Sequence, residues 1–110
     1  MQIQINSDRN IQGHQEMSSQ ITGVVESALG RFNAHITRVE VHVSDENGDK
    51  TSKNDMRCMM EARLEGRQPV AVTEQAATLD QAVDGAADKL ARMLDSILGQ
   101  QRDQQRERSN

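Results

Sequence analysis

Aromatic side chains are almost absent from this sequence. Its 110 residues include one phenylalanine, no tyrosine and no tryptophan. Proteins that bind single-stranded nucleic acid without sequence preference stack bases on aromatic side chains, so the composition excludes a stacking platform of that kind. The single cysteine, Cys58, excludes a disulfide within the chain and fits a reducing cytoplasm.

Long apolar runs and basic blocks are missing as well. No window approaches the ~18 consecutive apolar residues of a membrane span. The N-terminus, MQIQINSDRN, lacks the basic and apolar regions of a secretory signal. We therefore expect a cytoplasmic protein that does not contact membranes. With 13 Lys+Arg against 17 Asp+Glu, the net charge is −4, which argues against general binding to polyanions. Any contact with nucleic acid must then come from a local patch.

The spacing of the apolar residues predicts four strands and two helices. Period-two alternation indicates strands over 1–7, 36–44, 56–65 and 70–74. Apolar spacings of three and four indicate helices over about 15–31 and 78–98. The expected buried faces are Met17, Ile21, Val24, Val25, Ala28 and Phe32 in the first helix, and Leu79, Val83, Ala86, Leu90, Leu94 and Ile97 in the second.

Helix signals and polar stretches set the expected boundaries. Thr78 is predicted to be the N-cap of the second helix, with Gln81 completing a capping box, and Gly99 is the expected end of that helix. The stretch 45–55, DENGDKTSKND, is predicted to be a mobile connection. Residues 1–99 would form one domain, and residues 100–110, which include no apolar residue, a disordered polar tail.

These elements define a fold class. Two helices with one apolar face each must cover one face of the sheet, which predicts an α+β two-layer sandwich. Its order is β-α-β-β-β-α, with a four-stranded mixed sheet and both helices on one face. The first strand–helix–strand unit is a right-handed crossover if its strands are parallel, and the remaining strands form an antiparallel meander.

Cationic residues are expected on two parts of this fold. The outer sheet face collects Arg38, Arg57 and Arg63, together with acids and His42. This face is interpreted either as cross-strand ion pairs on a solvated sheet or as a polar binding surface. Lys89 and Arg92 share a face of the second helix. In one interpretation this face is a solvated surface on which Asp88 and Arg92 form an (i, i+4) ion pair. In the other, Lys89 and Arg92 contact phosphates. Arg31 and Arg38 flank the first helix and the second strand.

Residue patterns typical of catalysis or metal binding are not found. His14, His35 and His42 do not have the spacing of metal ligands, and Cys58 alternates with apolar neighbours as a small buried hydrophobe does. No glycine-rich phosphate loop is present, and DENGDK places its glycine wrongly for a calcium loop. We expect no enzymatic activity, no metal, no cofactor and no small-molecule substrate. A small enzyme would instead need a concave pocket with perturbed titratable groups.

Two segments resemble a known family. They are ITRVEVHVSDENGDK, over 36–50, and VDGAADKLARML, over 83–94. Together with the order of the predicted strands and helices, they resemble the bacterial ribosome hibernation-promoting factor and ribosome-associated inhibitor family (HPF/RaiA). The resemblance covers roughly residues 1–99 and is to the short form. It implies a non-enzymatic, cytoplasmic translation regulator that responds to stress. Such a protein docks on rRNA of the small ribosomal subunit, between head and body, and blocks the mRNA and tRNA path.

The resemblance also implies which residues contact rRNA. Lys89 and Arg92 match the basic positions of the DKLAR segment; Arg31, Arg38, Arg57 and Arg63 are further candidates from their exposure and charge. The alternative function is a protein-interaction module that has the same fold, does not bind ribosomes and uses the exposed sheet face. Weak homodimerisation through an open sheet edge is left open.

Overall fold

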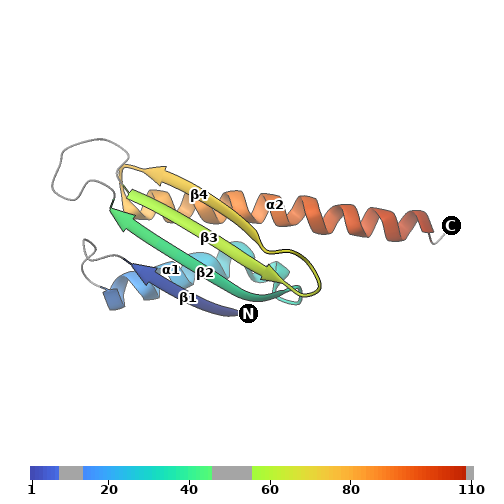
Figure 1. Ribbon diagram of the computed structural model, residues 1–110, viewed down its shortest axis with the longest axis horizontal. Helices are drawn as coiled ribbons and strands as arrows, with labels where there is room; N and C mark the ends of the chain where they lie inside the picture. The colour runs from blue at the N-terminus through green and yellow to red at the C-terminus, as the bar shows by residue number, and fades with distance from the viewer. Residues whose placement is uncertain (8–13, 46–55, 109–110) are drawn as a thin grey trace.

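A four-stranded sheet with two helices packed against one face makes up the fold (Figure 1). The computed structural model describes residues 1–7, 14–45 and 56–108, and it describes their side chains except at His14 and after residue 99. The predicted mobile connection therefore lies outside the described residues, apart from Asp45. The elements are β1 (Gln2–Ser7), α1 (His14–Leu29), the short 3-10 helix η1 (Gly30–Phe32), β2 (Ile36–Asp45), β3 (Met56–Leu64), β4 (Val70–Ala76) and α2 (Leu79–Arg108).

The strand order in the sheet is β1-β2-β3-β4. β1 pairs in parallel with β2, whereas β2 with β3 and β3 with β4 are antiparallel. This mixed sheet, with the order β-α-β-β-β-α, confirms the fold predicted from the sequence. Figure 1 shows both helices on the same side of the sheet, so its other face is not covered by a helix.

Alternation along the strands separates the core from the outer face. On β2, Val39, Val41 and Val43 are buried, and on β3 Cys58 and Met60 are buried. Burying each such side chain contributes about 1.5–3 kcal/mol relative to leaving it exposed. The helices complete this core with Met17, Ile21, Val25 and Leu29 from α1, and with Ala82, Val83, Ala86, Ala87, Leu90, Ala91, Leu94 and Leu98 from α2.

The ends of the helices differ in how well the sequence predicts them. The predicted cap of α2 is confirmed, because the backbone N–H of Gln81 donates to Thr78 Oγ1 at 3.2 Å. Phe32 is buried as expected, but it lies in η1, since α1 ends at Leu29.

The predicted end of α2 at Gly99 is wrong. The helix continues to Arg108, where the sequence indicated a disordered tail from residue 100. Gly99 does not have the left-handed backbone that a terminating glycine adopts. The residues after it are mainly Gln, Arg and Glu, which are good helix formers and need no buried face to propagate a helix that has already begun. Figure 1 shows this part of α2 extending past the sheet.

Replacing Gly99 with alanine tests the continuation of α2. A Cβ at this position meets no atom within 4 Å, and alanine is favoured over glycine inside a helix by about 1 kcal/mol. Gly99→Ala should therefore increase the helical signal in far-UV circular dichroism and raise the free energy of unfolding measured in urea. A decrease in both quantities would contradict the continuous helix, because a left-handed terminal glycine is destabilised by alanine.

The thiol of Cys58 should be unreactive in the folded protein. Burial raises its pKa from 9.0 to about 12, and the thiolate is the reactive form. At about pH 8 we expect a thiol reagent to modify the native protein at least about a thousandfold more slowly than the urea-unfolded protein. Reaction at similar rates would contradict the burial of this side chain.

The same shift makes stability depend on alkaline pH. Because the folded-state pKa is raised, the contribution of Cys58 is fully present below pH 9.0 and is lost as the pH rises toward about 12. A Cys58→Ala variant should lack this part of the decline in unfolding free energy, which urea titrations at several pH values would show.

Candidate nucleic-acid interface

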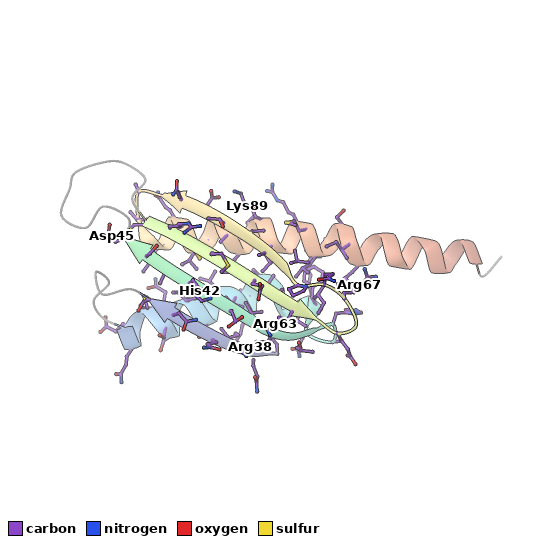
Figure 2. All side chains as sticks on the ribbon, in the orientation of Figure 1. Arg38, His42, Asp45, Arg63, Arg67 and Lys89 are labelled. Atoms are coloured by element: carbon purple, nitrogen blue, oxygen red, sulfur yellow. The ribbon has the colours of Figure 1, made fainter. Side chains whose placement is uncertain are left out.

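The six cations predicted to contact rRNA divide between two surfaces of the fold. Arg38, Arg57 and Arg63 lie on the outer face of the sheet, while Arg31, Lys89 and Arg92 belong to the helix layer. Figure 2 shows Arg38 and Arg63 in front of the sheet and Lys89 beside β4. Because the sheet separates its outer face from the helices, the six side chains do not form one patch.

On the outer face, arginines and glutamates occupy neighbouring rows of the sheet. Arg38 is paired in register with Arg63, and Glu40 with Glu61, so like charges lie opposite one another within each row. The attractions run between the rows. Glu40 accepts a hydrogen bond from Arg38 Nη2 at 3.1 Å and forms an ion pair with Arg63 Nη2 at 3.3 Å, and Glu61 lies 3.4 Å from Arg63 Nε. Of these three ion pairs, Arg63–Glu40 is the one that joins two strands.

In this four-residue network the outer face carries the expected ion pairs, one between strands and two within a strand, and the polar binding surface stays a prediction. The Glu40 side chain is 17% exposed and binds both arginines, so the network balances two positive and two negative charges. His42 lies on the same face, in the next row. Arg57 is exposed one row further along β3. The outer face therefore carries cations that are largely compensated by carboxylates.

Lys89 is bound at the edge of β4. Its Nζ donates to the backbone carbonyl of Thr73 at 3.1 Å and lies 3.4 Å from Glu74 Oε1. Glu74 is paired in register with the buried Cys58, which places it on the helix-facing side of the sheet. The alternation along the chain predicted only that the strand ends near Glu74, so this contact was not expected, whereas β4 continues to Ala76.

Gly85 makes room for that glutamate. A Cβ at position 85 would lie 2.7 Å from Glu74 Cγ, closer than side chains pack. A glycine in the middle of a helix destabilises the helix by about 1 kcal/mol relative to alanine. Its presence at position 85 therefore indicates that another group approaches the helix backbone closely. The sequence alone does not identify that group as Glu74.

The other two cations of the helix layer also have acidic partners. Arg92 pairs with Asp88 at 3.0 Å, the predicted (i, i+4) contact, and its side chain is 80% exposed. Arg31 Nη1 lies 3.4 Å from Asp95 Oδ1, and its guanidinium is 4.4 Å from the centroid of the Phe32 ring. Exposed ion pairs of this kind contribute about 0–1 kcal/mol each, so an incoming phosphate can displace the carboxylate at little cost.

An open groove of about 740 Å³ runs between α1 and α2. Small residues, among them Gly23, Ala87 and Ala91, line it, and Asp84 and Asp88 add negative charge. Cys58, whose pKa is raised, does not line this groove. In the described segments, no cluster of three or more His, Cys, Asp or Glu side chains could hold a metal ion. None of the helices in the described part of the chain is long and apolar enough to cross a membrane.

Comparison with known proteins identifies the family. Residues 9–102 match the family described as sigma 54 modulation protein / S30EA ribosomal protein. The N-terminal domain of Protein Y from Thermus thermophilus is 25% identical, with a TM-score of 0.62, and the alignment covers 88% of this chain and 99% of that one.

A ribosomal subunit interface protein from Coxiella burnetii is 15% identical, with a TM-score of 0.63 and coverage of 90% of this chain and 99% of the other. At that identity, the likeness shows the fold alone. No curated protein sequence matches the chain. The family match extends from the residues before α1 into the last part of α2, and it confirms the resemblance seen in the two sequence segments. This chain belongs to the sigma 54 modulation protein / S30EA ribosomal protein family, whose members are ribosome-associated modulation factors.

Proposed function

We propose that this chain docks on rRNA of the small ribosomal subunit and blocks the path of mRNA and tRNA. The observation that carries the proposal is the family match over residues 9–102. The fold shared with the N-terminal domain of Protein Y supports it. The protein would act in the cytoplasm, by occupying a site on the ribosome rather than by catalysing a reaction.

Exchange of ion-pair partners is the proposed docking mechanism. Lys89 and Arg92 lie three residues apart on α2 and are half or more exposed, and each has a carboxylate partner at 3.0–3.4 Å. An rRNA phosphate would replace Glu74 or Asp88 as the partner of the cation. Folded RNA is recognised largely through its backbone and grooves, which suits a chain with a single phenylalanine.

This mechanism also explains how an acidic chain can bind RNA. When a cation binds a phosphate, counterions are released from the RNA, but the carboxylate that was paired with the cation loses its partner. The gain in binding free energy for each contact is therefore smaller than for a cation without a partner. We expect binding with few phosphate contacts and a shallow dependence on salt concentration.

Removing the two α2 cations should abolish docking. A Lys89→Gln/Arg92→Gln variant loses two positive charges at exposed positions and should no longer co-sediment with purified small subunits at about 50–200 mM salt. The matched control is Gln15→Glu/Ser19→Glu, which makes the same change in net charge at exposed positions of α1 and should still bind. If the wild-type chain failed to co-sediment even at about 50 mM salt, the ribosome proposal would be wrong. In that case, the outer sheet face would be the surface on which to search for a protein partner.

Removing the competing carboxylates should have the opposite effect. In a Glu74→Gln/Asp88→Asn variant, Lys89 and Arg92 keep their charges but lose their carboxylate partners. Since each exposed pair is worth about 0.2–1 kcal/mol and two pairs are removed, affinity for the small subunit should rise about two- to thirtyfold. Salt titrations of the two proteins measure the change. Unchanged affinity would show that these carboxylates do not compete with rRNA.

A further inference from the structure

Three segments that are distant in the sequence meet at one end of the molecule. They are η1 with the turn after it, the β3–β4 turn, and α2 near Leu98. Two hollows of about 400 Å³ and 380 Å³ lie among them and share His35 and Leu98. We refer to the two together as the terminal hollow. Its volume is within the range of small-molecule sites, which is about 300–1,000 Å³.

Backbone hydrogen bonds fix the walls of the terminal hollow. The N–H of His35 donates to the carbonyl of Phe32 at 2.8 Å, and the N–H of Glu65 donates to the carbonyl of His35 at 3.0 Å. Gly66 has a φ of 73°, the left-handed conformation that favours glycine, and it reverses the chain between β3 and β4. His35 and Arg67 are thereby held on either side of the same space. Figure 2 shows Arg67 beside this turn and α2.

The terminal hollow combines an apolar floor with cationic walls. Phe32, Leu64 and Leu98 are buried beneath it, whereas Arg31 and Arg67 are exposed at its walls. Among the side chains that the structure describes, Glu65 is the one carboxylate that lines it, and Arg31 is paired with Asp95 outside the lining. The groove between α1 and α2 is lined instead by Asp84 and Asp88, with Arg31 as its single cation. Of these two concave surfaces, the terminal hollow is the one whose charge suits a phosphate.

Arg31 adds a planar surface to this site. Its guanidinium lies 4.4 Å from the centroid of the Phe32 ring, and stacking of this type orients the guanidinium plane. The Arg31 side chain remains 59% exposed. Unpaired RNA bases stack on arginine planes as well as on aromatic rings, so the scarcity of aromatic residues does not prevent base recognition here.

We propose that the terminal hollow binds one unpaired nucleotide of RNA. Arg67 and His35 would bind the phosphate, and Arg31 would present its plane to the base. This proposal rests on the proposed function in one respect, the identity of the RNA, because the bound nucleotide would be an unpaired nucleotide of rRNA. It adds His35 and Arg67 to the RNA contacts, two residues outside the six cations predicted from the sequence.

Titration of the isotope-labelled full chain with a short unpaired oligoribonucleotide, followed by NMR, tests this site. We expect saturable shifts at the amides of His35, Gly66, Arg67 and Leu98. In a His35→Gln/Arg67→Gln variant, the affinity should fall about tenfold, as expected for the loss of charge-assisted contacts. Both side chains are exposed, so the fold should be retained, and unchanged amide shifts elsewhere would confirm it. Ser19→Glu, which alters net charge by the same amount on α1, should bind as the wild type does.

Two results of the titration would overturn the proposal. The first is the absence of shifts around the terminal hollow at low salt. The second is equal affinity for inorganic phosphate and for the oligoribonucleotide, since a bare anion site would then account for the binding. Neither result depends on the ribosome. If His35→Gln/Arg67→Gln left co-sedimentation with small subunits unchanged while Lys89→Gln/Arg92→Gln abolished it, the terminal hollow would be excluded and the proposed function retained.

Discussion

Packing of both helices against one face of the sheet is the contact on which the other features depend. Val39, Val41 and Val43 alternate with Arg38, Glu40 and His42 along β2, so burial of the valines directs the polar side chains outward. The same packing brings α2 against β4 and places Lys89 within reach of Glu74. It also brings Leu98 under the β3–β4 turn, where it becomes part of the terminal hollow. The positions of the charged groups are therefore set by the apolar core.

Electrostatic compensation is the second general property of this protein. Carboxylate partners lie at 3.0–3.4 Å from five of the predicted RNA-binding cations, Arg31, Arg38, Arg63, Lys89 and Arg92, and Arg57 also interacts within the chain. In a protein with a net charge of −4, recognition of RNA cannot depend on a broad positive field. Under the proposed function it would depend on local exchange of partners, so affinity for RNA would be set as much by the carboxylates as by the cations. Substitutions of Asp or Glu are then as informative about binding as substitutions of Lys or Arg.

The sequence predicted those features that depend on short-range patterns. Alternation identified the four strands, and the (i, i+4) spacing predicted the Asp88–Arg92 pair. Thr78 was recognised as a cap because its partner, Gln81, is three residues away. In contrast, the Lys89–Glu74 contact spans 15 residues and depends on how α2 lies across β4, which periodicity does not determine. The terminal hollow joins positions 31 to 98 and was not predicted for the same reason. Gly99 was wrongly predicted to end α2, because the local sequence does not distinguish a glycine that ends a helix from one inside a helix that continues through polar residues.

The hydrogen bond from Lys89 to the Thr73 carbonyl has a consequence for self-association. β4 is an edge strand, and unpaired backbone groups on edge strands are templates for the addition of a strand from another molecule. While Lys89 Nζ occupies this carbonyl, one acceptor on the edge is unavailable to a second chain. Recruitment of Lys89 by an rRNA phosphate would release it. Under the proposed function, the β4 edge would therefore be best protected in the free protein and least protected when Lys89 is bound to rRNA.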